Sequence, residues 1–133
     1  IVHEIIKIGM SAVFQNVPSL LARIRSTFGS NSKEQEDQIF SALIDVDVLV
    51  LDDAGAEKWT DWTKASIYRI IDERYRHMRP TLLTSNCDLS ELELQIGDRA
   101  IDRIIELCEI KEIKAESYRK ILARRRKAEK MVE

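Results

Sequence analysis

Two groups of polar residues in this chain have the types and positions needed for phosphoryl-transfer chemistry. Asp52 and Asp53 end an apolar run that begins at Val46, and Asn86 follows a second apolar run over residues 81–85. Two adjacent carboxylates can hold a hydrated Mg²⁺ and orient an attacking water, and a neutral amide beside them can position that water. Plainer interpretations are a strand that stops at solvent for the acids and a turn or helix cap for Asn86.

Strand-like and helical patterns alternate around these residues. The run over residues 46–53 is rich in β-branched side chains, which is typical of a strand buried on both faces of a parallel sheet. Further strands are predicted at residues 11–16, 81–85 and 109–114, and helices at 1–8, 18–28, from 32, 61–77, 89–95, 98–108 and from 117 onward. This order predicts an α/β domain with a mainly parallel sheet flanked by helices, whose carboxyl edge carries the acids.

Composition sets the broad class of protein. The 133 residues suffice for a single domain, 1–133, and 44% hydrophobic with 33% charged residues indicates a globular chain. The net charge of -2 gives no overall attraction to nucleic acid or membrane, and no apolar run is long enough to span a bilayer. Cys87 and Cys108 form no disulfide framework and suit a reducing, cytoplasmic setting. Because a helical pattern opens at Ile1, we expect the chain to start inside a domain.

The C-terminal part supplies arginines that could reach a phosphate. Arg99 and Arg103 lie four residues apart, so they share a helix face, and Arg119 follows a predicted helix start at Ser117. Basic residues also gather over 120–130. These positions suit contact with a nucleotide or with single-stranded DNA phosphates. They equally suit solvated helix faces with intrahelical ion pairs, and both interpretations stay open.

In order and spacing these motifs resemble the AAA+ ATPase domain of the DnaC/DnaI helicase loaders and the related IstB-like transposition helpers. The resemblance covers nearly the whole chain. It implies that Asp52 is the Mg²⁺-associated acid of a Walker B strand and that Asp53 is the water-activating acid. It further implies that Asn86 is the sensor 1 residue, that Arg103 is an arginine finger acting on a neighbouring subunit, and that Arg119 is the sensor 2 arginine.

The chain departs from this family at its phosphate-binding loop. The sequence contains no GxxxxGK[ST], so the backbone amides and lysine that cradle the β- and γ-phosphates are absent from it. We therefore expect the AAA+ sheet to lack its first strand and phosphate loop, and the 133 residues alone to bind ATP poorly and to be inactive. In the family that strand is central, so its loss predicts an unpaired sheet edge and self-association.

The resemblance implies a DNA replication protein that loads the replicative helicase onto single-stranded DNA, with ATP and Mg²⁺ as cofactors in the intact protein and a homo-oligomeric state. Two alternatives within the family are an ATPase that assists DNA transposition and a non-catalytic module that docks on a helicase. A receiver-type phosphotransfer domain would need an aspartate at the end of the next strand. That strand ends in Thr84-Ser85-Asn86 instead.

Overall fold

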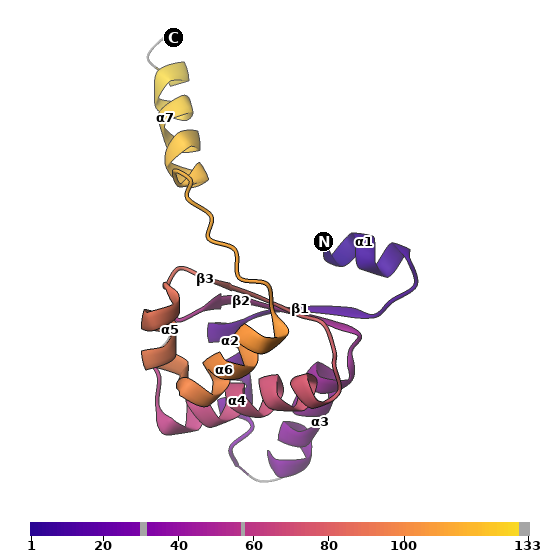
Figure 1. The fold of residues 1–133 in the computed structure, drawn as a ribbon. Coiled ribbons are helices and arrows are strands. Elements are labelled where there is room, and N and C mark those ends of the chain that lie inside the picture. Colours follow the sequence, from indigo (N-terminus) through magenta and orange to yellow (C-terminus); the bar gives the residue numbers. More distant parts are fainter. Residues whose placement is uncertain (30–31, 57, 131–133) are drawn as a thin grey trace.

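The computed structural model describes residues 1–29, 32–56 and 58–130 and contains one parallel sheet with helices around it (Figure 1). The strands are β1 (Ala12–Asn16), β2 (Val48–Ala54) and β3 (Thr81–Ser85). The helices are α1 (Val2–Lys7), α2 (Val17–Ser26), α3 (Ser32–Asp45), α4 (Asp61–Arg76), α5 (Leu89–Ile96), α6 (Asp98–Leu107) and α7 (Tyr118–Lys130). The predicted α/β class and the strands predicted at residues 11–16, 46–53 and 81–85 are confirmed.

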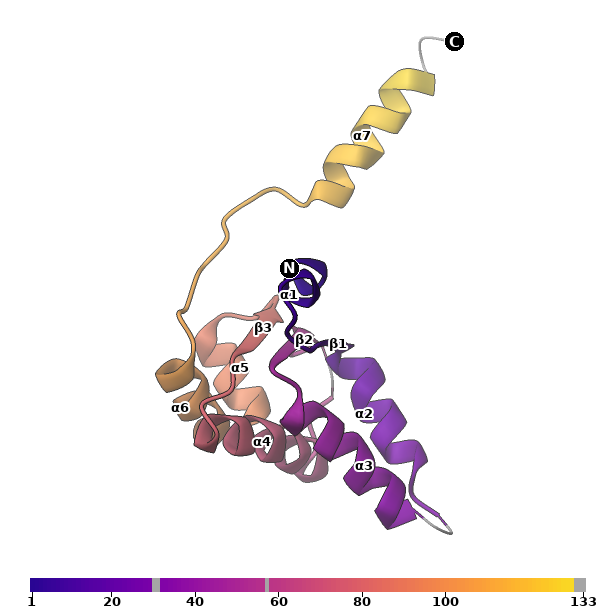
Figure 2. The ribbon, with the colours of Figure 1, turned by 90° about the vertical axis from the view of Figure 1, so that its right-hand side faces the viewer.

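The acidic strand β2 lies in the centre of the sheet, which has the order β1-β2-β3 with both pairings parallel. Helices α2 to α6 lie on one side of the sheet and α1 on the other (Figure 2). Leu49 and Leu51 of β2 are fully buried, and Val50 between them is 5% exposed. Phe14 of β1, the register partner of Val50, is 54% exposed, so the side that carries α1 stays partly open.

Local capping explains where the helices around the site begin. Thr60 caps α4 in a reciprocal capping box with Thr63, and Asp88 caps α5 in the same way with Glu91. Asn16, the last residue of β1, accepts a hydrogen bond from the Ser19 amide and caps α2. Each of these caps starts the helix that follows a strand, β1 before α2, β2 before α4 and β3 before α5.

A buried arginine lies at the amino-terminal ends of β2 and β3, opposite to the end that carries the acid pair. Arg74 of α4 is fully buried and has no carboxylate within hydrogen-bonding range among its contacts. Its guanidinium donates hydrogen bonds to the backbone carbonyls of Leu43, Ile44, Val46, Asp47 and Pro80 and to the Thr81 hydroxyl. Burial lowers the pKa of Arg74 to about 10. Because several acceptors belong to the end of α3 and to the strand starts, this side chain joins α3, β2 and β3.

One sequence prediction is wrong in the structure. Residues 109–114 form no strand; they run as an extended connection from α6 to α7, where Ile113 is 87% exposed. Ion pairs between Lys111 and Glu109 and between Lys114 and Glu112 are local to the segment, and no sheet neighbour accompanies it. The predicted N-terminal helix exists as α1, and none of its residues is buried. None of the helices in the described part of the chain is long and apolar enough to cross a membrane.

Candidate functional site

The acid pair and Asn86 meet at the carboxyl edge of the sheet. The Thr84 hydroxyl donates a hydrogen bond of 2.6 Å to Oδ1 of Asp52, and Nδ2 of Asn86 donates one of 3.1 Å to Oδ1 of Asp53. Asp52 and Asp53 are partly exposed, and Thr84 and Asn86 are exposed. The prediction that Asp53 and Asn86 lie together at one edge of the sheet is therefore confirmed, and the cluster faces open solvent.

The backbone of β2 is irregular where the acids stand. The register pairs Leu51 with Leu83 and then Ala54 with Ser85, so a bulge separates the two pairs. Asp53 has a φ of 63°, a left-handed conformation that is uncommon outside glycine. Strain of this kind in a non-glycine residue concentrates at functional sites, where surrounding contacts maintain it.

The loop after the acids packs against Cys87, just before α5, and against Gln95, near the end of that helix. Gly55 has a φ of 98°, and a Cβ atom there would come within 2.8 Å of both Cys87 Sγ and Gln95 Oε1. The Ser85 hydroxyl also donates a hydrogen bond to the Ala54 carbonyl. The φ of 98° and these close contacts both favour glycine at position 55, and the Ser85 hydrogen bond connects the end of β2 to the end of β3.

Two hydroxyl residues at this edge, Thr84 and Ser85, were not predicted to have individual roles. The sequence signal for them is the small polar tip of β3 immediately before Asn86. Their contacts depend on the pairing of β2 with β3, which brings together residues about thirty positions apart.

The donor set of the cluster fits a hydrated Mg²⁺. Magnesium in nucleotide-binding proteins is commonly held by one or two carboxylates together with waters and substrate phosphates. Within residues 1–29, 32–56 and 58–130 no group of three or more His, Cys, Asp or Glu side chains could hold a metal. Asp52 and Asp53 would therefore hold the ion together with further oxygen ligands, such as bound waters or phosphates.

Arg103 lies on α6 and contacts α4 of its own chain. Its Nε donates a hydrogen bond of 3.2 Å to Oδ1 of Asp72, and its guanidinium lies 4.4 Å from the centroid of the Tyr75 ring. The hydrogen bond to Asp72 raises the pKa of Arg103. Asp72 is nearly buried and also pairs with Arg76 at 2.8 Å. The structure thus brings Arg103 to a network between α4 and α6 and not to the acid pair of the same chain.

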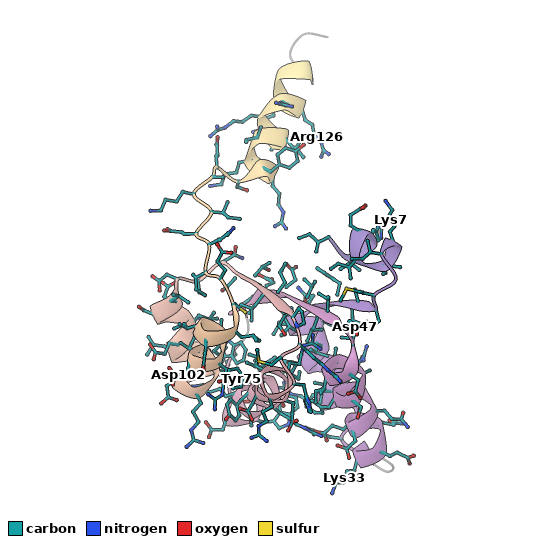
Figure 3. All side chains as sticks on the ribbon, turned by 45° about the vertical axis from the view of Figure 1, so that its right-hand side comes forward. Lys7, Lys33, Asp47, Tyr75, Asp102 and Arg126 are labelled. Carbon is teal, nitrogen blue, oxygen red and sulfur yellow. The ribbon has the colours of Figure 1, made fainter. Side chains whose placement is uncertain are left out.

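Arg119 lies in α7, which projects away from the sheet and its helices in two perpendicular views (Figures 1 and 2). Figure 3 shows the same separation at Arg126, further along the helix. The side chains of α7 from Arg119 to Lys127 are mostly exposed, and Arg124 pairs with Glu116 at 2.6 Å. In this arrangement the structure does not bring Arg119 to the acid pair.

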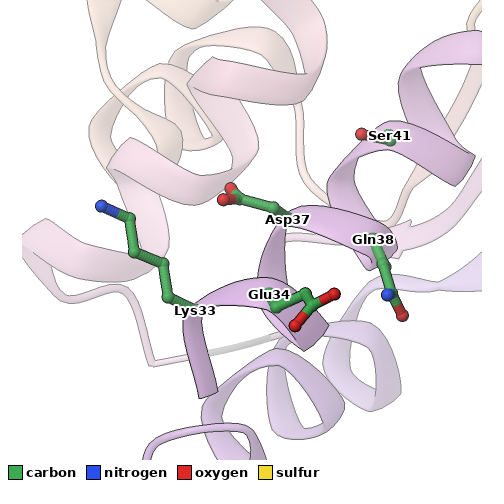
Figure 4. A pocket seen from close by; sticks show the side chains of 5 residues that line it. All are labelled: Lys33, Glu34, Asp37, Gln38 and Ser41. Carbon is green, nitrogen blue, oxygen red and sulfur yellow. The ribbon is translucent and has the colours of Figure 1, made fainter. Parts of the chain in front are cut away.

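A separate shallow hollow of about 700 Å³ lies along the N-terminal half of α3 (Figure 4). It is lined by Lys33, Glu34, Asp37, Gln38 and Ser41. Asp37 is paired with Arg69 of α4 at 3.1 Å. The lining comes from one helix and includes none of the residues at the carboxyl edge, so we do not assign the hollow to the candidate site.

A parallel sheet with an acid pair at the end of its central strand, and an asparagine facing that pair from the next strand, fits the AAA+ class of proteins, and solved structures similar to this chain belong to that class. The solved structure of the DnaC helicase loader matches with a TM-score of 0.72 and 26% identity over 83% of this chain and 65% of that one. The replication initiator DnaA, solved with AMPPCP and single-stranded DNA, matches with a TM-score of 0.68 at 18% identity over 78% of this chain and 31% of its own, which supports the fold.

Residues 1–128 match the family described as IstB-like ATP binding protein, and the chain belongs to that family. The replicative helicase loader DnaC of Escherichia coli (strain K12) is 31% identical over 104 residues, which cover 78% of this chain and 42% of the relative. The DnaC protein of Buchnera aphidicola subsp. Baizongia pistaciae is 33% identical over 96 residues, 72% of this chain and 39% of the relative. The chain thus spans about two fifths of the length of these relatives.

Proposed function

We propose that this chain is part of a cytoplasmic DNA replication protein that loads the replicative helicase onto single-stranded DNA and uses ATP hydrolysis to do so. The observation that supports this most is the contact of Asp52 and Asp53 with Thr84 and Asn86 at the carboxyl edge of the sheet. The chain belongs to an ATP-binding family, and the curated relatives described above are named replicative helicase loaders.

Each residue of the cluster has a separate role in the proposed reaction. Asp52 would hold Mg²⁺, which neutralises charge on the phosphate oxygens when it is bound. Asp53 would accept a proton from the attacking water, and the Asn86 amide would orient that water while it fixes the Asp53 carboxylate through the hydrogen bond at 3.1 Å. The partial exposure of the carboxylates leaves room for a nucleotide to approach from the carboxyl edge.

The arginines would act when several copies assemble. We infer that Arg103 serves the active site of a neighbouring subunit, which requires a homo-oligomer. Its contacts with Asp72 and Tyr75 support this role, because they restrict the guanidinium on a helix whose outer face is charged and exposed. Arg119 would approach the nucleotide of its own chain only if α7 packs closer to the sheet than it does here.

Single-stranded DNA is the second proposed partner. The exposed basic residues of α7 form a surface that suits phosphate contacts, and its charge contrasts with the net charge of -2 of the whole chain. Binding through phosphates should weaken steeply as the salt concentration rises. A binding isotherm that is independent of salt would argue against this surface.

The proposal is tested with the replicative helicase of the same organism and a circular single-stranded DNA. A protein that contains this chain together with a phosphate-binding loop should bind the helicase and increase the amount of it recovered on the circle in an ATP-dependent manner. The variant Asp52→Ala should lose the ATP dependence, whereas Glu93→Gln, an exposed acid on α5, should behave as the unaltered protein does.

The match to the IstB-like family is compatible with one competing function, the assistance of DNA transposition that the sequence resemblance also implies. A transposition helper would stimulate a transposase and leave helicase loading unchanged. A non-catalytic docking module would bind the helicase equally well with and without ATP. Either result would replace the loader assignment.

A further inference from the structure

The β-bulge at the acid pair is bridged by one side chain. Asp52 and Asp53 together face Thr84 between the two regular pairs of the register. In an undisturbed ladder the Asp53 amide would donate to a backbone carbonyl of the neighbouring strand. Here it donates to the Thr84 hydroxyl oxygen at 3.1 Å. The side chain of Thr84 therefore takes the place of a ladder acceptor.

The same hydroxyl also acts on the second acid. Its proton is donated to Oδ1 of Asp52 at 2.6 Å, while its oxygen accepts from the Asp53 amide. A hydroxyl has one proton and two lone pairs, so both bonds form at once and in only this direction. The bond to Oδ1 fixes the rotation of the Asp52 carboxylate, and the bond from the amide supports the left-handed backbone of Asp53.

We propose that Thr84 is a positioning residue for the acid pair, which orients the Asp52 carboxylate toward a hydrated divalent cation and holds Asp53 in its left-handed conformation. This inference rests on the proposed role of Asp52 in Mg²⁺ binding. A purely structural role as a strand residue predicts something different: Thr84 is exposed, so an isosteric valine would serve the strand equally well.

Amide hydrogen exchange in the 133-residue chain tests whether the Thr84 hydroxyl stabilises the backbone conformation of Asp53. Thr84→Val keeps the shape and β propensity but has no hydroxyl, and we expect the Asp53 amide to exchange about tenfold faster. Thr84→Ser keeps the hydroxyl and should restore slow exchange. The Leu51 amide, in the regular part of β2, should exchange alike in all three proteins, which would show that the sheet is intact. If the Asp53 amide exchanged at the same rate in the Thr84→Val variant as in the unaltered chain, the proposal would be overturned.

Binding of Mn²⁺ tests the effect on Asp52 separately from ATP hydrolysis. In the unaltered chain Mn²⁺ should broaden the NMR signals of the residues around Asp52, and Asp52→Asn should abolish this effect. Thr84→Val should require a several-fold higher Mn²⁺ concentration for the same broadening, and Thr84→Ser should not. Undiminished binding by Thr84→Val would refute the orienting role. Absence of broadening in the unaltered chain would instead refute the metal role of Asp52. Hydrogen exchange would still test whether Thr84 stabilises the backbone conformation of Asp53.

Discussion

Asn86 at the end of β3 donates a hydrogen bond of 3.1 Å to the carboxylate of Asp53, which lies at the end of the central strand and 33 residues earlier in the chain. The contact joins an acid that can accept a proton to an amide that can orient a water, and it forms on the edge where open α/β sheets bind their ligands. The following predictions depend on this edge and on the elements that hold it.

Asp53→Asn should block ATP hydrolysis and spare ATP binding in a chimaera that supplies the phosphate-binding loop of a DnaC relative ahead of Ile1. Loss of a general base lowers kcat by about 10²–10⁴-fold. Asparagine tolerates the left-handed conformation as aspartate does, so the fold should be retained. Steady-state hydrolysis and nucleotide binding measure the two effects, with Glu93→Gln as the matched control. Hydrolysis at an undiminished rate would remove Asp53 from the mechanism.

Arg103 should act on a neighbouring subunit. In the same chimaera, Arg103→Ala and Asp53→Asn subunits should each be inactive, while their mixture should recover part of the activity at interfaces that combine an intact arginine with an intact acid. Asp72→Asn serves as a control, because it weakens the contact of Arg103 with α4 but keeps the guanidinium. Co-assembled mixtures without any hydrolysis would contradict the trans assignment.

Arg74→Met should destabilise the domain strongly. The substitution keeps much of the buried volume but leaves carbonyls at the end of α3 and at the strand starts without a donor, and each such group costs about 1–3 kcal/mol. We expect the free energy of unfolding to fall by about 3 kcal/mol or more, as measured by urea titration. Arg69→Met removes an exposed ion pair with Asp37 and should cost less than about 1 kcal/mol. Equal effects of the two variants would show that Arg74 contributes no more than a surface arginine.

The 133-residue chain should self-associate at micromolar concentration. Across the described ranges β3 pairs with β2 alone, so its other edge offers free backbone groups, and Phe14 leaves apolar surface exposed on the α1 side. A second copy can cover both features. Sedimentation measures the mass, and Leu82→Lys, a charge on the edge strand, should shift the population toward monomer. A compact monomer that melts cooperatively would show that the sheet edge needs no partner.

The sequence predicted the acid-bearing edge well because its signals are local. The apolar run of β2 ends in carboxylates, and Thr60 and Asp88 are recognisable helix caps. Residues 109–114 contain isoleucines between charges, a pattern that indicates a strand only where a neighbour exists to pair with. The contact of Arg103 with Asp72 joins residues 31 positions apart, and the double hydrogen bond of Thr84 depends on a bulge. Such features follow from packing and register, which local patterns do not determine.

At Asp53, backbone conformational stability and the proposed role of the carboxylate favour different residue types. Glycine adopts a φ of 63° without the Cβ contact that every other L-residue meets, so Asp53→Gly relieves strain while it deletes the carboxylate. Substitutions selected only for relief of this strain would therefore remove the carboxylate to which we assign activation of the attacking water. Consensus or stability-guided redesign of this family should keep position 53 fixed, because relief of backbone strain and the proposed role of Asp53 make opposite demands there.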